Sequence, residues 1–89
     1  MPTTNVIRGA GFLEFQGREA PVAYVVEFWR DKRVQGADGK VNGDFGNLNA
    51  ALARSDVFLR LEDGRRAAVV LTDLSFAGGS RIAVNGPFE

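Results

Sequence analysis

The reactive side chains of this sequence are carboxylates and serines, because the chain contains neither histidine nor cysteine. A serine nucleophile at Ser55, Ser75 or Ser80 would need a general base beside it, and histidine is the commonest one. Thiol chemistry and the imidazole or thiolate ligands of transition metals are excluded by the same composition. We therefore predict that the protein is not an enzyme, and we expect neither a cofactor nor a metal site.

The carboxylates show no catalytic pattern. Acid–base chemistry such as glycoside hydrolysis needs two carboxylates at a fixed separation. Asp31, Asp38, Asp44 and Asp63 are instead expected in or next to turns, where an Asp side chain commonly bonds to nearby backbone. The segment 38–44 also lacks the ligand spacing and the late glutamate of a calcium loop. We interpret these acids as turn residues.

One short motif stands near the C-terminal end: Asp73-Leu74-Ser75-Phe76-Ala77-Gly78. It resembles the Asp-x-Ser-x-x-Gly motif of PilZ domains, and this resemblance implies a β-barrel that binds cyclic di-GMP. In that family an Arg-x-x-x-Arg motif lies further upstream and several strands follow. Here Arg65 and Arg66 are adjacent and too close, and eleven residues follow Gly78. The sequence is not assigned to the family, and cyclic dinucleotide binding stays an alternative.

Charge is balanced along the chain, with eleven basic and eleven acidic residues. No global field would attract a nucleic acid or an anionic membrane, so we expect no membrane binding and consider nucleic acid an unlikely partner. Two local basic clusters could form an anion-binding patch, as in small barrels that bind single strands. Their candidate residues are Arg30, Arg33, Arg65 and Arg66. Anion or nucleic-acid binding is therefore the alternative function.

A surplus of large apolar residues favours protein contact instead. Phe12, Trp29 and Phe58 fall on strand faces opposite the best core residues, and Trp, Phe and Arg are enriched at protein interfaces. A neutral surface also makes self-association easier. We predict a non-enzymatic binding or assembly module whose interface is anchored by these three residues, with another protein or a second copy as partner. The other interpretation is that one monomer buries both faces.

Short β-favouring runs separated by turn residues predict a single all-β domain over residues 1–89, an antiparallel barrel or sandwich of about six to eight strands with one short helix. Asp38-Gly39 and Asp63-Gly64 are the strongest hairpin signals, and Gln16-Gly17 and Asn42-Gly43 are weaker ones. The helix is expected at 47–54, capped by Asn47. The predicted strands are Asn5–Arg8, Gly11–Gln16, Ala20–Arg30, Lys32–Ala37, Lys40–Phe45, Val57–Glu62, Arg65–Leu74 and Ser80–Asn85.

The start of the sequence has no apolar run behind a basic segment, and no stretch reaches membrane-spanning length. Together with the lack of cysteine, this favours a cytoplasmic protein.

Overall fold

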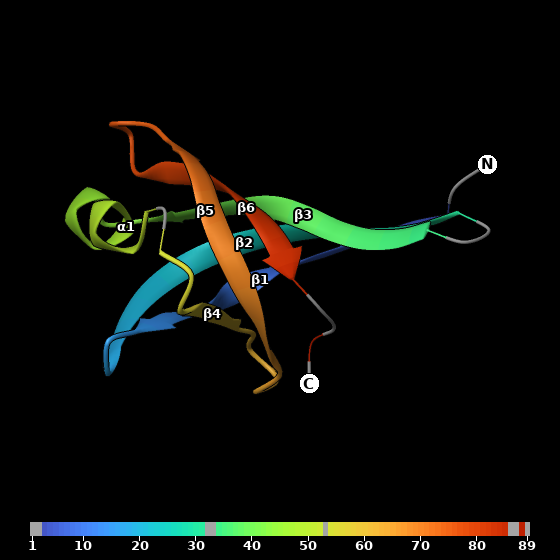
Figure 1. The fold of residues 1–89 in the computed structure, drawn as a ribbon, viewed down its shortest axis with the longest axis horizontal. Coiled ribbons are helices and arrows are strands. Elements are labelled where there is room, and N and C mark those ends of the chain that lie inside the picture. Colours follow the sequence, from blue (N-terminus) through green and yellow to red (C-terminus); the bar gives the residue numbers. More distant parts are fainter. Residues whose placement is uncertain (1–2, 32–33, 53, 86–87, 89) are drawn as a thin grey trace.

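The computed structural model describes residues 3–31, 34–52, 54–85 and 88, and only the backbone at 3–4, 29–31 and 34–35. Six antiparallel strands close into a barrel in the order β1-β2-β3-β6-β5-β4 (Figure 1). The prediction of an all-β barrel with one short helix is confirmed. The elements are β1 (Thr3–Phe15), β2 (Arg18–Asp31), β3 (Val34–Gly43), α1 (Phe45–Ala51), β4 (Val57–Arg60), β5 (Arg66–Leu74) and β6 (Gly79–Asn85).

Side-chain alternation along each strand fills the barrel. In β2, Val22, Tyr24 and Val26 are buried, whereas Ala23 and Val25 face outward. Neighbouring strands contribute their own alternate residues, and Leu48 and Ala51 of α1 complete the core. The largest fully buried side chains are Leu13, Leu48, Leu59, Leu71, Val26, Val41, Val57 and Val69. The core is therefore mainly aliphatic, with Phe15 and Tyr24 as its aromatic members, and contains no buried charged side chain among the described residues.

The hairpin predicted at Asp38-Gly39 is wrong. Both residues lie inside β3, and Gly39 pairs with Val26 of β2 on one side and with Ile82 of β6 on the other. A Cβ atom on Gly39 would collide with the Val25 carbonyl oxygen, so this glycine is needed for close approach of two strands. The weaker signal at Gln16-Gly17 forms the tight turn, with φ of 51° and 72° as a type I′ hairpin requires.

The Asp63-Gly64 hairpin is confirmed, although its loop is longer than two residues. Leu61 N–H donates to the Arg65 carbonyl at 2.7 Å, Gly64 N–H donates to the Leu61 carbonyl at 3.0 Å, and Gly64 has a φ of 91°. Positive φ at one position, where a type I′ turn needs two, explains the wider loop.

The helix begins earlier than predicted, and Asn42-Gly43 makes no hairpin because it ends β3 just before that helix. Asp44 is the N-cap, and its carboxylate accepts the Asn47 N–H at 3.1 Å. Both Asp44 and Asn47 are favourable N-cap residue types; because the helix begins at Phe45, Asn47 lies in its first turn, where its backbone N–H donates to the cap.

The two predicted segments 5–8 and 11–16 form one continuous strand, β1. Glycines interrupt the hydrophobic pattern because neighbours pack closely over them. A Cβ atom on Gly11 would collide with the Arg60 carbonyl oxygen, and one on Gly9 would lie 2.7 Å from the Tyr24 hydroxyl oxygen. That hydroxyl accepts the Glu62 N–H at 3.2 Å.

Among the described residues, no helix is long and apolar enough to cross a membrane.

Replacing Gly11 with alanine should destabilise the fold by about 3 kcal/mol, because the added methyl group overpacks the junction of β1 and β4. Gly17→Ala is the matched control: its φ of 72° is strained for alanine, but nothing lies within 4 Å. It should lose about 1 kcal/mol. Urea unfolding at equilibrium measures both variants. A Gly11→Ala loss no larger than that of Gly17→Ala would contradict overpacking at this junction.

Candidate protein-binding surfaces

The outer side of β1, β4 and β5 carries a cluster that we call the arginine–aromatic face: Phe12, Glu14, Phe58, Arg60 and Arg66. Strand register puts these residues together. Phe12 pairs with Arg60, and Arg60 pairs with Arg66. In the adjacent row, Glu14 pairs with Phe58. Since paired residues lie on the same side of a sheet, aromatic rings, cations and a carboxylate alternate over three strands.

Each aromatic ring of this face lies under a guanidinium group. The Arg60 guanidinium carbon lies 4.9 Å from the Phe12 ring centroid, and that of Arg66 lies 4.5 Å from the Phe58 centroid. Both rings are half-buried. Such cation–π contacts contribute about 0.5 to 1 kcal/mol each at exposed sites. The two rings therefore already make favourable contacts within the monomer, although they still present apolar surface to a partner.

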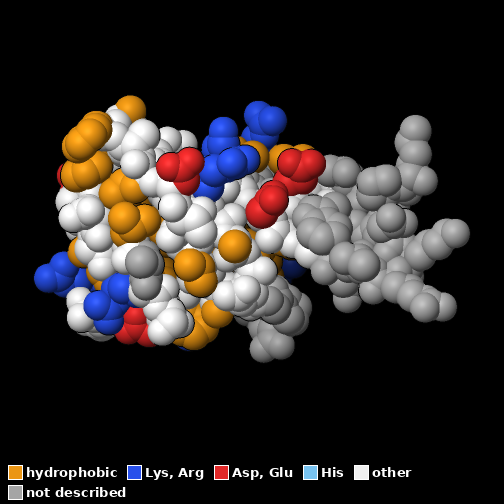
Figure 2. Space-filling view, turned by 45° about the horizontal axis from the view of Figure 1, so that its top comes forward, with side chains coloured by type: hydrophobic (Ala, Val, Ile, Leu, Met, Phe, Trp, Pro, Cys, Tyr) orange, Lys and Arg blue, Asp and Glu red, His pale blue; other side chains and the backbone are white. Residues whose placement is uncertain are grey.

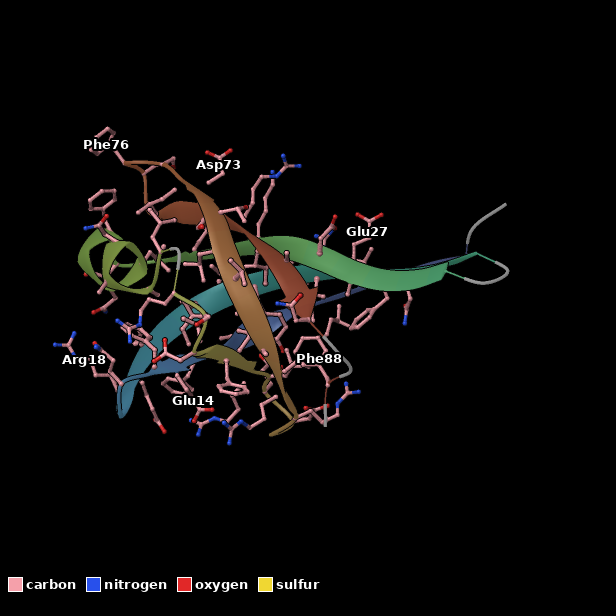
Figure 3. All side chains as sticks on the ribbon, viewed as in Figure 1. Glu14, Arg18, Glu27, Asp73, Phe76 and Phe88 are labelled. Atoms are coloured by element: carbon pink, nitrogen blue, oxygen red, sulfur yellow. The ribbon has the colours of Figure 1, made fainter. Side chains whose placement is uncertain are left out.

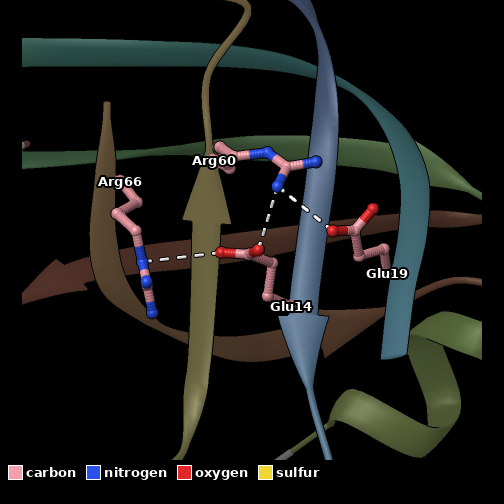
Figure 4. A network of polar contacts seen from close by, with 4 residues as sticks. All are labelled: Glu14, Glu19, Arg60 and Arg66. Atoms are coloured by element: carbon pink, nitrogen blue, oxygen red, sulfur yellow. Dashed lines mark hydrogen bonds and ion pairs between the residues drawn. The ribbon is translucent and has the colours of Figure 1, made fainter. Parts of the chain in front are cut away.

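Glu14 links the two arginines (Figure 4). Its Oε2 accepts Arg60 Nη1 at 3.2 Å, and its Oε1 lies 3.5 Å from Arg66 Nε. Glu19 of β2 accepts the same Arg60 nitrogen at 3.1 Å. Two cations directly opposite on neighbouring strands repel each other, so the carboxylate between them offsets that repulsion. Glu14 Oε1 is nevertheless buried without a hydrogen-bond donor among the described residues.

The structure separates the three predicted anchors. Phe12 and Phe58 meet on the arginine–aromatic face, whereas the backbone of Trp29 pairs with Thr4 and Gly36. Thr4 lies eight residues from Phe12 along β1, which is about 27 Å at 3.4 Å per residue. The side chain of Trp29 lies outside the described residues. The anchors proposed from the sequence therefore do not form one patch around Phe12 and Phe58.

Of the four predicted anion-binding residues, the structure describes the side chains of Arg65 and Arg66. Arg65 Nε bonds Asp63 Oδ2 at 2.7 Å, and Arg66 is held by Glu14 as described above. The Arg65 N–H and then its guanidinium lower the pKa of Asp63 below its ordinary value. The side chain of Arg30 and all of Arg33 lie outside the described residues. The two arginines whose side chains are described are thus neutralised by nearby acids.

The PilZ-like segment forms the end of β5 and the β5–β6 hairpin. Gly78 has a φ of 87°, its N–H donates to the Ser75 carbonyl at 3.0 Å, and its carbonyl accepts the Gly43 N–H at 2.8 Å. Phe76 is 93% exposed and stacks on Phe45 with ring centroids 5.3 Å apart. Hairpin geometry accounts for the glycine of the motif.

A second surface is the arm, which we define as residues 3–9 of β1, 27–31 of β2 and 34–37 of β3. These segments run beyond the barrel as a three-stranded ribbon (Figure 1), and the molecule is 39 Å long but 25 and 22 Å across. Among the described residues, β1 pairs with β4 only at Phe12–Glu14, so residues 3–9 have a strand on one side alone. Within the described ranges, the arm therefore has an unpaired β1 edge.

The direction of the free backbone groups follows from one hydrogen bond. Ala10 N–H donates to Glu62 Oε1 at 3.0 Å, so it points away from β2. Because N–H and C=O groups alternate in direction along an antiparallel strand, those of Val6 and Arg8 point the same way. Val6 is also one of three large apolar residues exposed on the described surface, at 44%. The edge thus offers backbone donors, backbone acceptors and an apolar side chain.

The outer side of the arm and the adjoining strands is divided into two charged rows. The basic row contains Arg8, Val25, Lys40 and Arg81, and the next row contains Val6, Glu27 and Asp38. No ion pair within 4 Å joins the two rows in the described part of the chain. On the face in Figure 2, basic and acidic groups gather close together without a broad patch of one sign. Figure 3 shows Glu27 on the arm, well apart from Glu14.

The chain matches no protein-family model, no curated protein and no solved structure. Residue types alone predicted Phe12 and Phe58 as anchors but not Val6 and Arg8, because the first strand was expected to end at Arg8 and an unpaired edge is not visible in a sequence. The polar residues at 3–5 followed by Val6 and Ile7 indicate a strand, but this pattern does not distinguish a paired strand from one with a free edge.

Glu14→Gln should destabilise the fold by about 1 to 2 kcal/mol, since it leaves Arg60 opposite Arg66 without the charge that offsets their repulsion. Glu19→Gln is the control, because its side chain is half exposed and its carboxylate forms an ion pair only with Arg60 among the described residues; it should change stability by less than about 0.5 kcal/mol. Urea unfolding at low and high salt tests this. A Glu14→Gln loss that does not shrink in salt would contradict an electrostatic cause.

Asp63 should titrate below the ordinary aspartate range, and Arg65→Gln should raise its pKa only part of the way back. The variant removes the guanidinium but keeps the Arg65 N–H, which is the larger cause of the lowered pKa. Because the folded pKa is depressed, the stabilisation is present at neutral pH and is lost as pH falls through that pKa. Carboxyl NMR titration measures this. Full return of the Asp63 pKa in the variant would show that the backbone bond contributes nothing.

Proposed function

We infer that the protein is a non-enzymatic binding or assembly module that acts by contact with another polypeptide, and that the contact is made along the β1 edge of the arm. The observation that carries this proposal is the row of unpaired backbone groups beside the exposed Val6. An extended polypeptide can add to such an edge as a further strand, with main-chain hydrogen bonds supplying affinity.

The edge lacks most of the features that keep free strands from pairing. Sheet edges are usually protected by a proline, a bulge, charged side chains or a covering loop. Arg8 is the charged side chain of residues 5–9. Residues 5–9 contain no proline, and their register against β2 is unbroken. The Glu62 carboxylate lies against Gly9 and accepts the Ala10 N–H, so it covers the edge at these two residues. A partner strand therefore has access to residues 5–8, and its pairing must end where Glu62 begins.

The arginine–aromatic face supports the same class of function less strongly. Its rings are half-buried and its cations are paired within the monomer, so a partner would gain less there than at unpaired backbone groups. Anion or nucleic-acid binding needs cations that are free to meet phosphates. Arg65 and Arg66 are instead held by Asp63 and Glu14, which favours protein contact over the anionic alternative.

A photo-crosslinking amino acid at position 6, in cells that produce the protein, should form an adduct with a polypeptide. Thr72, which is exposed on β5 away from the arm, is the control position. The adduct at position 6 should exceed that at position 72 by at least about tenfold, as expected where the label lies in a specific interface. No polypeptide adduct at position 6, or equal yields at both positions, would overturn the proposal. Mass spectrometry identifies whether the partner is foreign or a second copy.

A further inference from the structure

We propose that the partner at this edge is a second copy of the chain, which pairs β1 against β1 in antiparallel orientation around a two-fold axis beside Ile7. The inference rests on the proposed function and adds the identity of the partner and the register. It joins the two arms into one continuous sheet in which β1 of each copy becomes an inner strand.

Backbone geometry limits the possible registers. The N–H and C=O groups of Val6 and Arg8 point to the free edge, so hydrogen-bonded pairs must join even-numbered residues of the two copies. In the proposed register, Val6 pairs with Arg8 of the second copy and Arg8 pairs with Val6 of the second copy. Each pair exchanges both of its backbone bonds. Pairing ends at Arg8, because the Glu62 carboxylate lies against Gly9 and accepts the Ala10 N–H.

Charge complementarity selects this register among its neighbours. Because Val6 pairs with Arg8 of the second copy, the row that contains Val6 and Glu27 lies in line with the basic row of that copy. Glu27 and that Arg8 then lie two strands apart, roughly 10 Å between Cα atoms, with Val6 between them. Their long side chains can meet across Val6 and cover it. The two rows that form no ion pair within one chain thus find opposite charges in the other chain.

The adjacent registers are less favourable. A shift of the axis toward Arg8 places Arg8 opposite Arg8 of the second copy, and like charges directly opposite are destabilising. A shift toward Val6 places the acidic row in line with the acidic row of the second copy. The balanced charge of the chain adds no long-range repulsion between copies. The proposed register also brings two half-buried Ile7 side chains together on the inner side of the arm.

Light scattering coupled to size exclusion should give twice the chain mass of 9.6 kDa. Val6→Pro should give the monomer mass, because it removes an edge N–H that β2 does not use and adds a ring to the edge. Phe76→Ser is the matched control: it also removes an exposed apolar side chain, but away from the arm, and it should remain a dimer. A dimer that persists in Val6→Pro, or a monomeric wild type, would overturn the proposal.

Two measurements fix the register and keep the test valid if Val6→Pro does not fold. Arg8→Glu should raise the dimer dissociation constant at least about tenfold, and adding Glu27→Arg should restore it. Failure of the double variant to restore affinity would overturn the register. In the wild type, hydrogen exchange at the Val6 and Arg8 amides should slow as protein concentration rises, and exchange independent of concentration would overturn the pairing.

The outcomes separate this inference from the proposed function. A monomeric purified protein whose position 6 crosslinks to a foreign polypeptide in cells would leave the proposed function standing and remove the second copy as partner. A monomer with no adduct at position 6 would remove both.

Discussion

Barrel closure depends on a short seam between β1 and β4, where residues 12–14 pair with residues 58–60. Inside the seam, Leu13 and Leu59 are fully buried opposite each other. Outside it, Phe12 and Phe58 lie under guanidinium groups that Glu14 holds. One stretch of backbone pairing therefore fixes both the aliphatic core and the arginine–aromatic face. Because β4 is only four residues long, it covers one end of β1 and leaves the other end free.

Much of the fold could be predicted from residue types, because alternation between apolar and polar residues has a direct physical cause in the pleat of a strand. The errors lie at glycines. Asp38-Gly39 has the composition of a tight turn, yet Gly39 is selected by the approach of the Val25 carbonyl. Gly9 and Gly11 divided β1 in the sequence for the same reason. A sequence cannot distinguish a glycine needed for positive φ from one needed for close approach, since the second depends on a strand that pairs from elsewhere.

The candidate surfaces were predictable to different degrees. Phe12 and Phe58 were identified because large rings on the outer side of a strand conflict with simple burial, and the structure brings them together. Their pairing with Arg60 and Arg66 depends on cross-strand register, which residue types alone do not fix. The free edge of β1 could not be predicted from residue types at all. An unpaired edge is a property of where the neighbouring strand stops, so nothing within residues 5–9 marks it.

The seam also has a consequence for the order in which the chain folds. Strands β1, β2 and β3 pair with their neighbours in the sequence, whereas Leu13 and Leu59 meet although they lie 46 positions apart in the chain. Local contacts form with little loss of chain entropy, and distant ones must first close a large loop. The meander that contains the arm can therefore assemble while the barrel is still open. A newly made chain would then expose its free edge before its core is sealed, and early pairing between chains would compete with completion of each barrel.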